Sequence, residues 1–142
     1  MPAPRLLVIQ GNNADGRALP TAAGGRAPSE GYAELLRELL PKAAVDVCYP
    51  ADPGANLPDS AGLESYDGAV ITGSALHVYQ RGPHVDPQIE LTRAVLAAGT
   101  PLFGSCWGLQ LITVAAGGSV RRNPKGREIG FGRRIRLTAA GR

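Results

Sequence analysis

One short segment of the sequence carries residue types whose spacing suits covalent chemistry. Gly104, Cys106 and Gly108 form a Gly-x-Cys-x-Gly pattern between an apolar run and a segment with helical character. This is the arrangement of a nucleophile elbow with sulfur in place of a hydroxyl, in which flanking glycines let a strand and a helix approach around a strained residue. A thiol at the start of a helix lies where the helix dipole favours the thiolate. The pattern predicts Cys106 as a nucleophile and the amide of Trp107 as an oxyanion donor. The alternative is a structural cysteine in a tight turn.

An elbow of this kind needs a parallel sheet beneath it, and apolar runs do alternate with helical segments along the chain. Strands are predicted over residues 5–10, 45–49, 66–72 and 101–104. Helices are predicted over residues 32–40, 86–98 and 107–116, the second with Asp86 as its N-cap. Residues 11–31 and 50–62 are predicted as loops, and two further strands are expected near Val120 and over residues 131–137. The alternation indicates an α/β fold with a doubly wound, mostly parallel sheet, whose ligands bind beyond the carboxyl ends of the strands.

Length and composition favour a single globular domain and exclude a collagen, a membrane-spanning protein and a disulfide-stapled scaffold. The chain has 142 residues, of which 44% are hydrophobic and 19% charged, so it can bury a core. It has no apolar run of membrane-spanning length, and its N-terminus lacks the features of a secretory signal. Cys48 and Cys106 are therefore expected as free thiols of a cytoplasmic protein, with Cys48 in the core. The sequence contains no metal-ligand spacing, phosphate-binding loop or dinucleotide fingerprint, so neither a metal nor a cofactor is expected.

The charge is distributed unevenly along the chain. Residues 1–120 carry 7 Lys and Arg against 11 Asp and Glu, a net of −4, whereas residues 121–142 carry 8 against a single Glu, a net of +7. A basic segment can bind nucleic acid. Here, however, apolar residues such as Ile135 and Leu137 are interleaved with the charges and favour strands over a solvated arm. We therefore expect neither a nucleic-acid partner nor a membrane partner.

Around Cys106 the sequence resembles a known family. The segment Gly104-Ser105-Cys106-Trp107-Gly108-Leu109-Gln110 resembles the Gly-x-Cys-x-Gly-x-Gln signature of class I, triad-type glutamine amidotransferases. Residues 66–74 with His77, and residues 117–130, are similar to further segments of that family and follow the same order. The pattern is most similar to stand-alone members related to the amidotransferase domain of GMP synthetase, and it covers nearly the whole chain. The resemblance implies a flavodoxin-like fold.

The resemblance also implies a role for each matching residue. Cys106 would attack the side-chain amide of glutamine and form a γ-glutamyl thioester as ammonia leaves, and the amides of Ser74 and Trp107 would hold the oxyanion. The glutamine pocket would be shaped by Gly73, Gly108 and Gln110. The implied partners are glutamine or another γ-glutamyl amide, and a synthetase domain or subunit that receives the ammonia.

The base of this family is missing from the sequence. Triad-type members carry a His-x-Glu pair well downstream of the elbow, whereas this chain has only His77 and His84, both before Cys106. His77 is expected to be structural and His84 to lie on the surface, with either as an alternative base. We expect residues 1–142 to be the N-terminal portion of a single amidotransferase-like domain, cut before the His-x-Glu pair and inactive alone. The alternatives are a γ-glutamyl hydrolase acting on a conjugate and a non-catalytic binding or regulatory fragment.

Overall fold

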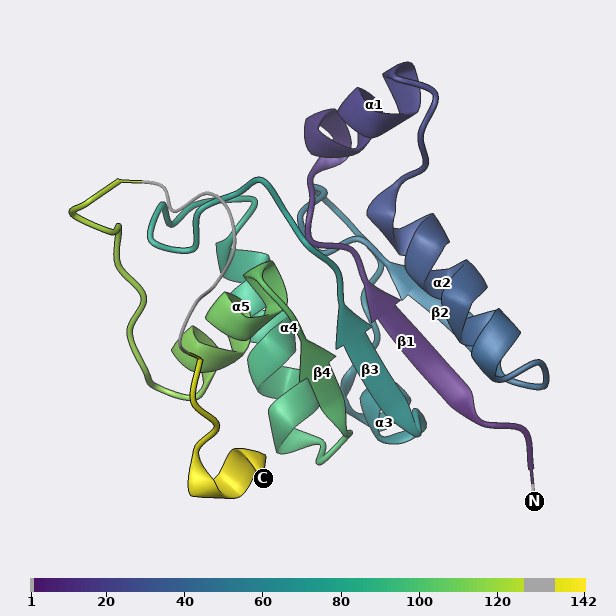
Figure 1. Cartoon of the computed structure of the whole chain (residues 1–142). Helices are drawn as coiled ribbons and strands as arrows, with labels where there is room; N and C mark the ends of the chain where they lie inside the picture. Colours follow the sequence, from purple (N-terminus) through teal and green to yellow (C-terminus); the bar gives the residue numbers. More distant parts are fainter. Residues whose placement is uncertain (1, 127–134) are drawn as a thin grey trace.

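A four-stranded parallel sheet forms the centre of the molecule. The computed structural model describes residues 2–126 and 135–142. Its strands are β1 (Arg5–Ile9), β2 (Ala44–Cys48), β3 (Gly68–Ile71) and β4 (Leu102–Gly104). Their order across the sheet is β2-β1-β3-β4, and every pairing is parallel (Figure 1). The four strands predicted over residues 5–10, 45–49, 66–72 and 101–104 are confirmed within two residues at each end.

Helices cover both faces of this sheet. On one face, α2 (Pro28–Leu39) packs against β1 and β2 (Figure 1). On the other face lie α3 (Ser60–Glu64), α4 (Asp86–Ala97) and α5 (Trp107–Ala115). The main core fills the space between these three helices and the sheet, and includes Leu7, Ile9, Leu63, Ile71, Ile89, Val95, Trp107 and Leu111. A parallel sheet with helices on both faces is the predicted flavodoxin-like α/β fold.

Two segments predicted as loops contain helices. Within residues 11–31 lies α1 (Ala14–Ala22), which buries none of its residues and therefore shows no apolar periodicity. It begins after Asn13, whose side-chain oxygen accepts a hydrogen bond from the amide of Gly16 at 3.0 Å. The five-residue helix α3 begins in the same way, because the Asp59 carboxylate accepts from the amide of Gly62 at 2.8 Å. Both helices start at side-chain caps rather than on an amphipathic pattern.

The start of α4 and the C-terminal segment also differ from the prediction. Val85 precedes α4 as its N-cap, and Asp86 is the first helical residue, with its carboxylate paired to Arg81. Within the described residues, neither Val120 nor residues 135–137 form a strand, and residues 131–134 of the predicted strand lie outside the described part of the chain. The last element is the short 3-10 helix η1 (Ala139–Gly141).

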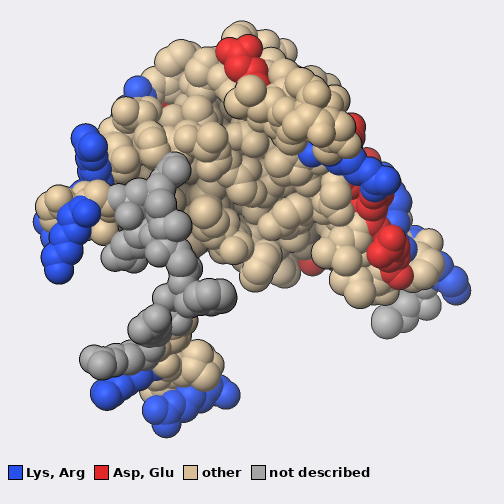
Figure 2. All heavy atoms as spheres, turned by 45° about the horizontal axis from the view of Figure 1, so that its top comes forward, with Lys and Arg blue, Asp and Glu red and all other residues tan. Residues whose placement is uncertain are grey.

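The visible surface has one region where acidic and basic side chains are mixed and another where the charge is basic (Figure 2). Figure 2 shows Lys and Arg side chains grouped on both sides of the grey residues, while the visible Asp and Glu side chains lie elsewhere. This grouping agrees with the net charge of +7 over residues 121–142. Among the described helices, none is both long and apolar enough to cross a membrane.

Candidate active site

Cys106 joins β4 to α5 in a strained backbone conformation. It stands two positions after the last residue of β4 and is the N-cap of α5. Its φ is 53° and its ψ is −103°, and it is the one non-glycine residue with a positive φ in the described part of the chain. Such a conformation costs about 1–3 kcal/mol and persists only where the surrounding structure imposes it. The thiol is exposed, so the predicted strained turn presents an accessible sulfur.

Two glycines make this turn possible. A Cβ on Gly104 would lie 2.6 Å from the carbonyl carbon of Gly108 and 2.8 Å from its oxygen. A Cβ on Gly108 would lie 3.0 Å from the Cβ of Ile71 in β3. The backbones of β4 and α5 are therefore in contact at the elbow, as the Gly-x-Cys-x-Gly pattern predicts. Gly108, which is also predicted at the glutamine pocket, is buried, and the lack of a side chain there lets α5 pack closely on β3.

Two backbone amides at the same edge of the sheet have no acceptor. Ile71 pairs with Gly104 across β3 and β4, so the loop that contains Ser74 and the turn that contains Cys106 leave neighbouring strand ends. Within the described residues, neither the Ser74 amide nor the Trp107 amide donates a hydrogen bond. The Trp107 amide is the first of α5, a position at which helices leave the N–H group free. Neither amide is therefore occupied by a hydrogen bond within the described residues.

The remaining predicted pocket residues lie in different surroundings. Gly73 is half-buried, and a Cβ built on it would meet no atom within 4 Å. Gln110 lines a pocket of about 740 Å³ together with His77, Tyr79 and the basic pair Arg121 and Arg122. The structure thus brings Gln110 and His77 to one pocket beside the elbow helix.

The two histidines occupy distinct positions. The ring of His77 is exposed and stacks on Tyr79, with ring centroids 5.2 Å apart and planes at 8°. The prediction that His84 lies on the surface is wrong, because the residue is half-buried and its Nδ1 donates to the carbonyl of Ala51 at 2.8 Å. Among the described residues, no hydrogen bond joins either ring to Cys106. Neither histidine is therefore hydrogen-bonded to the thiol as a base would be.

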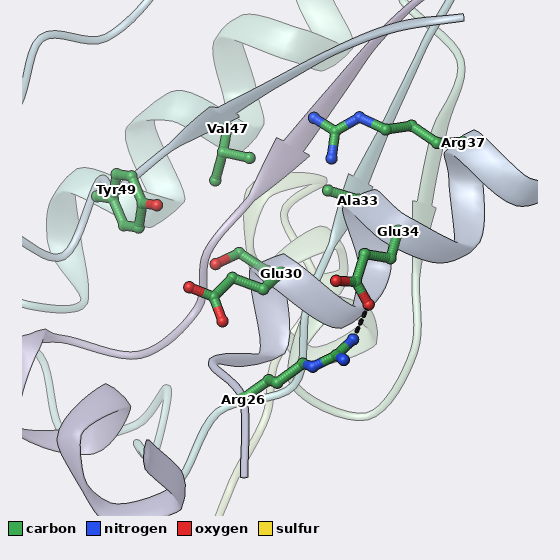
Figure 3. A pocket seen from close by; sticks show the side chains of 8 residues that line it. Arg26, Glu30, Ala33, Glu34, Arg37, Val47 and Tyr49 are labelled. Carbon is green, nitrogen blue, oxygen red and sulfur yellow. Dashed lines mark hydrogen bonds and ion pairs between the residues drawn. The ribbon is translucent and has the colours of Figure 1, made fainter. Parts of the chain in front are cut away.

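A second pocket lies away from the elbow, between α2 and β2. It has a volume of about 330 Å³ and is lined by α2 residues including Glu30, Glu34 and Arg37, with Val47 and Tyr49 from the strand side. Figure 3 shows that several of these side chains are charged, and that one of them, Glu34, is paired with Arg26. The lining contains neither cysteine nor histidine, so it offers no nucleophile for the chemistry predicted from the sequence.

Cys48 is the core thiol that the sequence predicts. It lies at the end of β2, is 5% exposed and belongs to the main core cluster. Burial raises the pKa of the Cys48 thiol from 9.0 to about 12. Neither cysteine is in a disulfide, and in the described part of the chain no group of three or more His, Cys, Asp or Glu could hold a metal ion.

Two buried amide side chains beside the elbow were not predicted. Gln88 of α4 accepts a hydrogen bond from the indole Nε1 of Trp107 at 2.9 Å. Asn12, in the loop after β1, accepts from the amide of Ala75 at 3.0 Å. Each contact joins residues far apart in the sequence, and the local sequence around a buried Gln or Asn carries no signal that distinguishes it from a solvated one.

Comparison with known proteins identifies the family. The family model described as "Glutamine amidotransferase class-I" matches residues 30–141. This range includes the elbow and the loop that follows β3. The chain belongs to the class I glutamine amidotransferase family. The match rests on most of the chain and agrees with the resemblance seen around Cys106.

Named relatives and solved structures support this assignment. The chain is 41% identical over 116 residues to a gamma-glutamyl-L-1-hydroxyisopropylamide hydrolase of Pseudomonas sp, covering 82% of this chain and 39% of that protein. It is 32% identical over 112 residues to the glutamine amidotransferase-like protein chry6 of Gibberella zeae, covering 76% and 45%. A match to gamma-glutamyl peptidase 4 of Arabidopsis thaliana has 33% identity over 75 residues, 53% of this chain and 30% of that one.

The structural matches agree on the fold. A glutamine amido transferase from Methylobacillus flagellatus superposes with a TM-score of 0.54 and 23% identity, over 87% of this chain and 43% of that one. A GMP synthase-type protein from Thermoplasma acidophilum gives 0.55 and 19%, over 84% and 48%. The chain spans less than half the length of each of these relatives.

Proposed function

We propose that the protein containing this chain hydrolyses the side-chain amide of glutamine through Cys106. The observation that carries the proposal is the positive φ of Cys106 at an exposed thiol, within the signature of a family whose members act on glutamine. A strained non-glycine residue in a βα turn is a recognised mark of a nucleophile elbow. The free amides of Ser74 and Trp107 at the same sheet edge support the assignment.

The chemistry that follows uses the thiolate of Cys106 as the nucleophile. Its sulfur attacks the side-chain carbonyl carbon of glutamine, and the carbonyl oxygen becomes an oxyanion held by the amides of Ser74 and Trp107. Collapse of the tetrahedral intermediate breaks the C–N bond, ammonia leaves with the proton that the base took from the thiol, and a γ-glutamyl thioester remains. The base then takes a proton from water as the water attacks the thioester carbon. The C–S bond breaks, and glutamate is released with the Cys106 thiolate restored. Gly73, Gly108 and Gln110 would form the wall of the glutamine site.

The proton transfers need a base that these residues do not supply at the thiol. We therefore propose that residues 1–142 are the N-terminal portion of one amidotransferase domain, and that the His-x-Glu pair of the family lies beyond them. The chain alone would then be inactive. An ammonia-accepting synthetase domain or subunit would be the partner, and two free thiols suit a cytoplasmic location.

A second candidate is a hydrolase that cleaves a γ-glutamyl conjugate and releases an amine other than ammonia. Two of the relatives carry names of this kind, a γ-glutamyl alkylamide hydrolase and a γ-glutamyl peptidase. The attack on the γ-carbonyl would be the same, since the two reactions differ only in the group that leaves. The products therefore distinguish the candidates.

The test compares the 142-residue chain with a longer polypeptide, namely the proposed whole domain that contains this chain and the His-x-Glu pair. Each is incubated with glutamine and with a γ-glutamyl alkylamide, and glutamate, ammonia and amine are measured. We expect the longer form to be active, the short chain to be inactive, and Cys106→Ser to lower kcat by at least about 10³-fold. Cys48→Ala is the matched control. It should keep activity within about twofold, because Cys48 lies in the core at the end of β2 and not at the elbow.

Labelling gives an independent readout. A chloro-ketone analogue of glutamine should modify Cys106 in the longer polypeptide and leave Cys48 unmodified. Label on Cys48, or activity retained in Cys106→Ser, would contradict the assignment of the nucleophile.

A further inference from the structure

The indole of Trp107 is anchored by a buried side chain of α4. Gln88 is fully buried, and its Oε1 accepts from Nε1 of Trp107 at 2.9 Å. Its Nε2 donates to the carbonyl oxygen of Gly11 at 3.1 Å and to that of His84 at 2.6 Å. All the polar atoms of the amide are thus used, and its orientation is fixed. Because the indole belongs to the residue whose backbone amide begins α5, this contact also limits where that amide points.

The loop that carries Ser74 is anchored by a second buried amide. Asn12 is 7% exposed, and its Oδ1 accepts from the hydroxyl of Ser74 and from the amide of Ala75, each at 3.0 Å. The Ser74 hydroxyl in turn accepts from the amide of Leu76 at 3.1 Å. These bonds close a tight turn around Ser74 and occupy the amides that follow it, while the Ser74 amide itself stays free.

The two anchors meet in adjacent residues of the loop after β1. The carbonyl oxygen of Gly11 accepts a hydrogen bond from Gln88, and the amide of Gly11 donates one to the hydroxyl of Thr72 at 2.9 Å. A Cβ on Gly11 would lie 2.7 Å from Cδ1 of Trp107, so the loop backbone touches the indole directly. Asn12, the next residue, holds the Ser74 turn. One short loop therefore contacts both segments that present the free amides.

We propose that Asn12 and Gln88 are positioning residues that hold the Ser74 and Trp107 amides at a fixed separation for the oxyanion. This inference rests on the proposed function, because it assigns the two amides to the transition state. Oxyanion donors act only within about 2.7–3.1 Å of the developing charge, and a shift of about 1 Å can cost about 10²-fold in rate. The directed hydrogen bonds that the Asn12 and Gln88 side chains accept fix orientation in a way that apolar packing does not.

The first test is a double-mutant cycle between Gln88 and Trp107 in the longer polypeptide. Trp107→Phe removes the indole N–H and keeps the backbone amide, and Gln88→Met removes the polar atoms at similar volume. We expect each variant to lower kcat for glutamine about 10- to 100-fold with KM changed by less than about threefold, since the oxyanion exists only in the transition state. The double variant should lower kcat by less than the product of the two single effects, because both changes break the bond between Gln88 and Trp107.

The second test uses two neighbouring asparagines as a matched pair. Asn12→Ala removes the anchor of the Ser74 turn, whereas Asn13→Ala removes only the N-cap of α1. The two residues are neighbours in one loop. Asn12→Ala loses two side-chain hydrogen bonds and Asn13→Ala loses one. We expect Asn12→Ala to lower kcat about 10- to 100-fold, and Asn13→Ala to lower the urea midpoint while leaving kcat within about twofold.

The outcomes separate the two levels of the proposal. If Cys106→Ser is inactive but Asn12→Ala and Gln88→Met keep the wild-type kcat, or change only KM, the positioning role is wrong and the proposed function stands. If Cys106→Ser is active, the proposed function itself fails. Should Asn12→Ala or Gln88→Met lose its circular dichroism signal, Ser74→Ala and Trp107→Phe decide, since each breaks the bond to its anchor and keeps the backbone amide. Unchanged kcat in both would overturn the positioning role.

Discussion

The strain at Cys106 is maintained by the contact between Gly104 and Gly108. Since a Cβ on Gly104 would fall 2.6 Å from the backbone of Gly108, Gly104→Ala cannot be accommodated by moving a side chain. Either β4 and α5 separate or the turn changes its dihedral angles. We expect this substitution to lower the free energy of unfolding of the 142-residue chain by about 2 kcal/mol or more, measured by urea denaturation.

Gly31→Ala is the control for this prediction. Gly31 lies in α2, and a Cβ there would meet no atom within 4 Å. Alanine should stabilise the helix by up to about 1 kcal/mol. Equal stabilities for Gly104→Ala and the wild type would mean that the elbow tolerates separation of its strand and helix.

Cys48 makes the stability of the fold depend on pH in the alkaline range. Its pKa is 9.0 when unperturbed and about 12 when buried in the fold, so between these values the unfolded chain releases a proton that the folded chain keeps. The stability contributed by the protonated thiol is complete below pH 9 and is lost as the pH rises toward 12, by up to about 1.4 kcal/mol per pH unit. Urea unfolding in reductant at about pH 8, 9 and 10 measures this loss.

Cys48→Ala isolates the contribution of the thiol from those of other groups. Tyr66, whose pKa is raised mainly by burial and also by Cys48, titrates in both proteins, so most of its contribution is common to the two. The stability difference between wild type and Cys48→Ala should shrink as the pH rises from about 9 to 10. A constant difference over that range would show that the thiol does not keep its proton in the folded chain.

At the scale of elements, the sequence was informative where burial creates a pattern. The four strands and α5 were predicted because buried apolar runs end at glycine or proline, and because the elbow signature places a helix directly after β4. α1 was missed because none of its residues is buried and Pro20 stands inside it. The helix is capped by Asn13 and is joined to Asp52 through Arg17. Neither contact produces a periodic pattern in the sequence.

The same reason limits what could be predicted of the candidate site. The elbow, its two glycines and the Trp107 amide follow from a local motif, whereas the Ser74 amide is implied only by the family resemblance; in the structure the two segments leave the neighbouring strands β3 and β4. Asn12 and Gln88 bind residues 63 and 19 positions away, and such contacts depend on the packing of α4 and of the β1 loop. Sequence patterns encode strands and helices, whereas these bonds appear only once the elements are assembled.

α1 is attached to the rest of the molecule mainly by Arg17. Its guanidinium makes two bonds to the carboxylate of Asp52, at 2.9 and 2.7 Å, donates to the carbonyl of Asn12 and lies over the ring of Tyr49. The pair is partly buried, and the hydrogen bond to Asp52 is the main cause that raises the pKa of Arg17. We expect Arg17→Ala to accelerate amide hydrogen exchange in α1 about tenfold, with little change in the β-strands.

Arg26→Ala is the matched control for α1. Arg26 also forms an ion pair, with Glu34, but both side chains are exposed, and such pairs contribute little. Its effect on exchange in α1 should stay below about twofold. Equal acceleration by both substitutions would show that the position of α1 does not depend on the Asp52 contact.

For the molecule as a whole, the sheet is covered unevenly. The face packed by α3, α4 and α5 holds the main core, whereas on the opposite face α2 packs mainly against β1 and β2. Val70 and Phe103 pair across β3 and β4 on this opposite face, and Phe103 is 60% exposed. An apolar hollow of about 300 Å³ lies there, lined by Leu6, Leu36, Val70 and Phe103 among others. A large aromatic residue on an open edge strand invites association.

Phe103→Thr tests whether further chain of the same domain covers this face. In the 142-residue chain the substitution removes exposed apolar surface, so we expect less self-association, measured by light scattering against concentration, with little loss of stability. If further chain covers the face in a longer polypeptide, the same substitution there should destabilise the fold by about 3 kcal/mol. If both forms respond alike, Phe103 is a surface residue in each, and the proposal that residues 1–142 are part of a larger domain loses its structural support. Less self-association of the 142-residue chain, together with lower stability of the longer polypeptide, would support this face as the surface on which the rest of the domain packs.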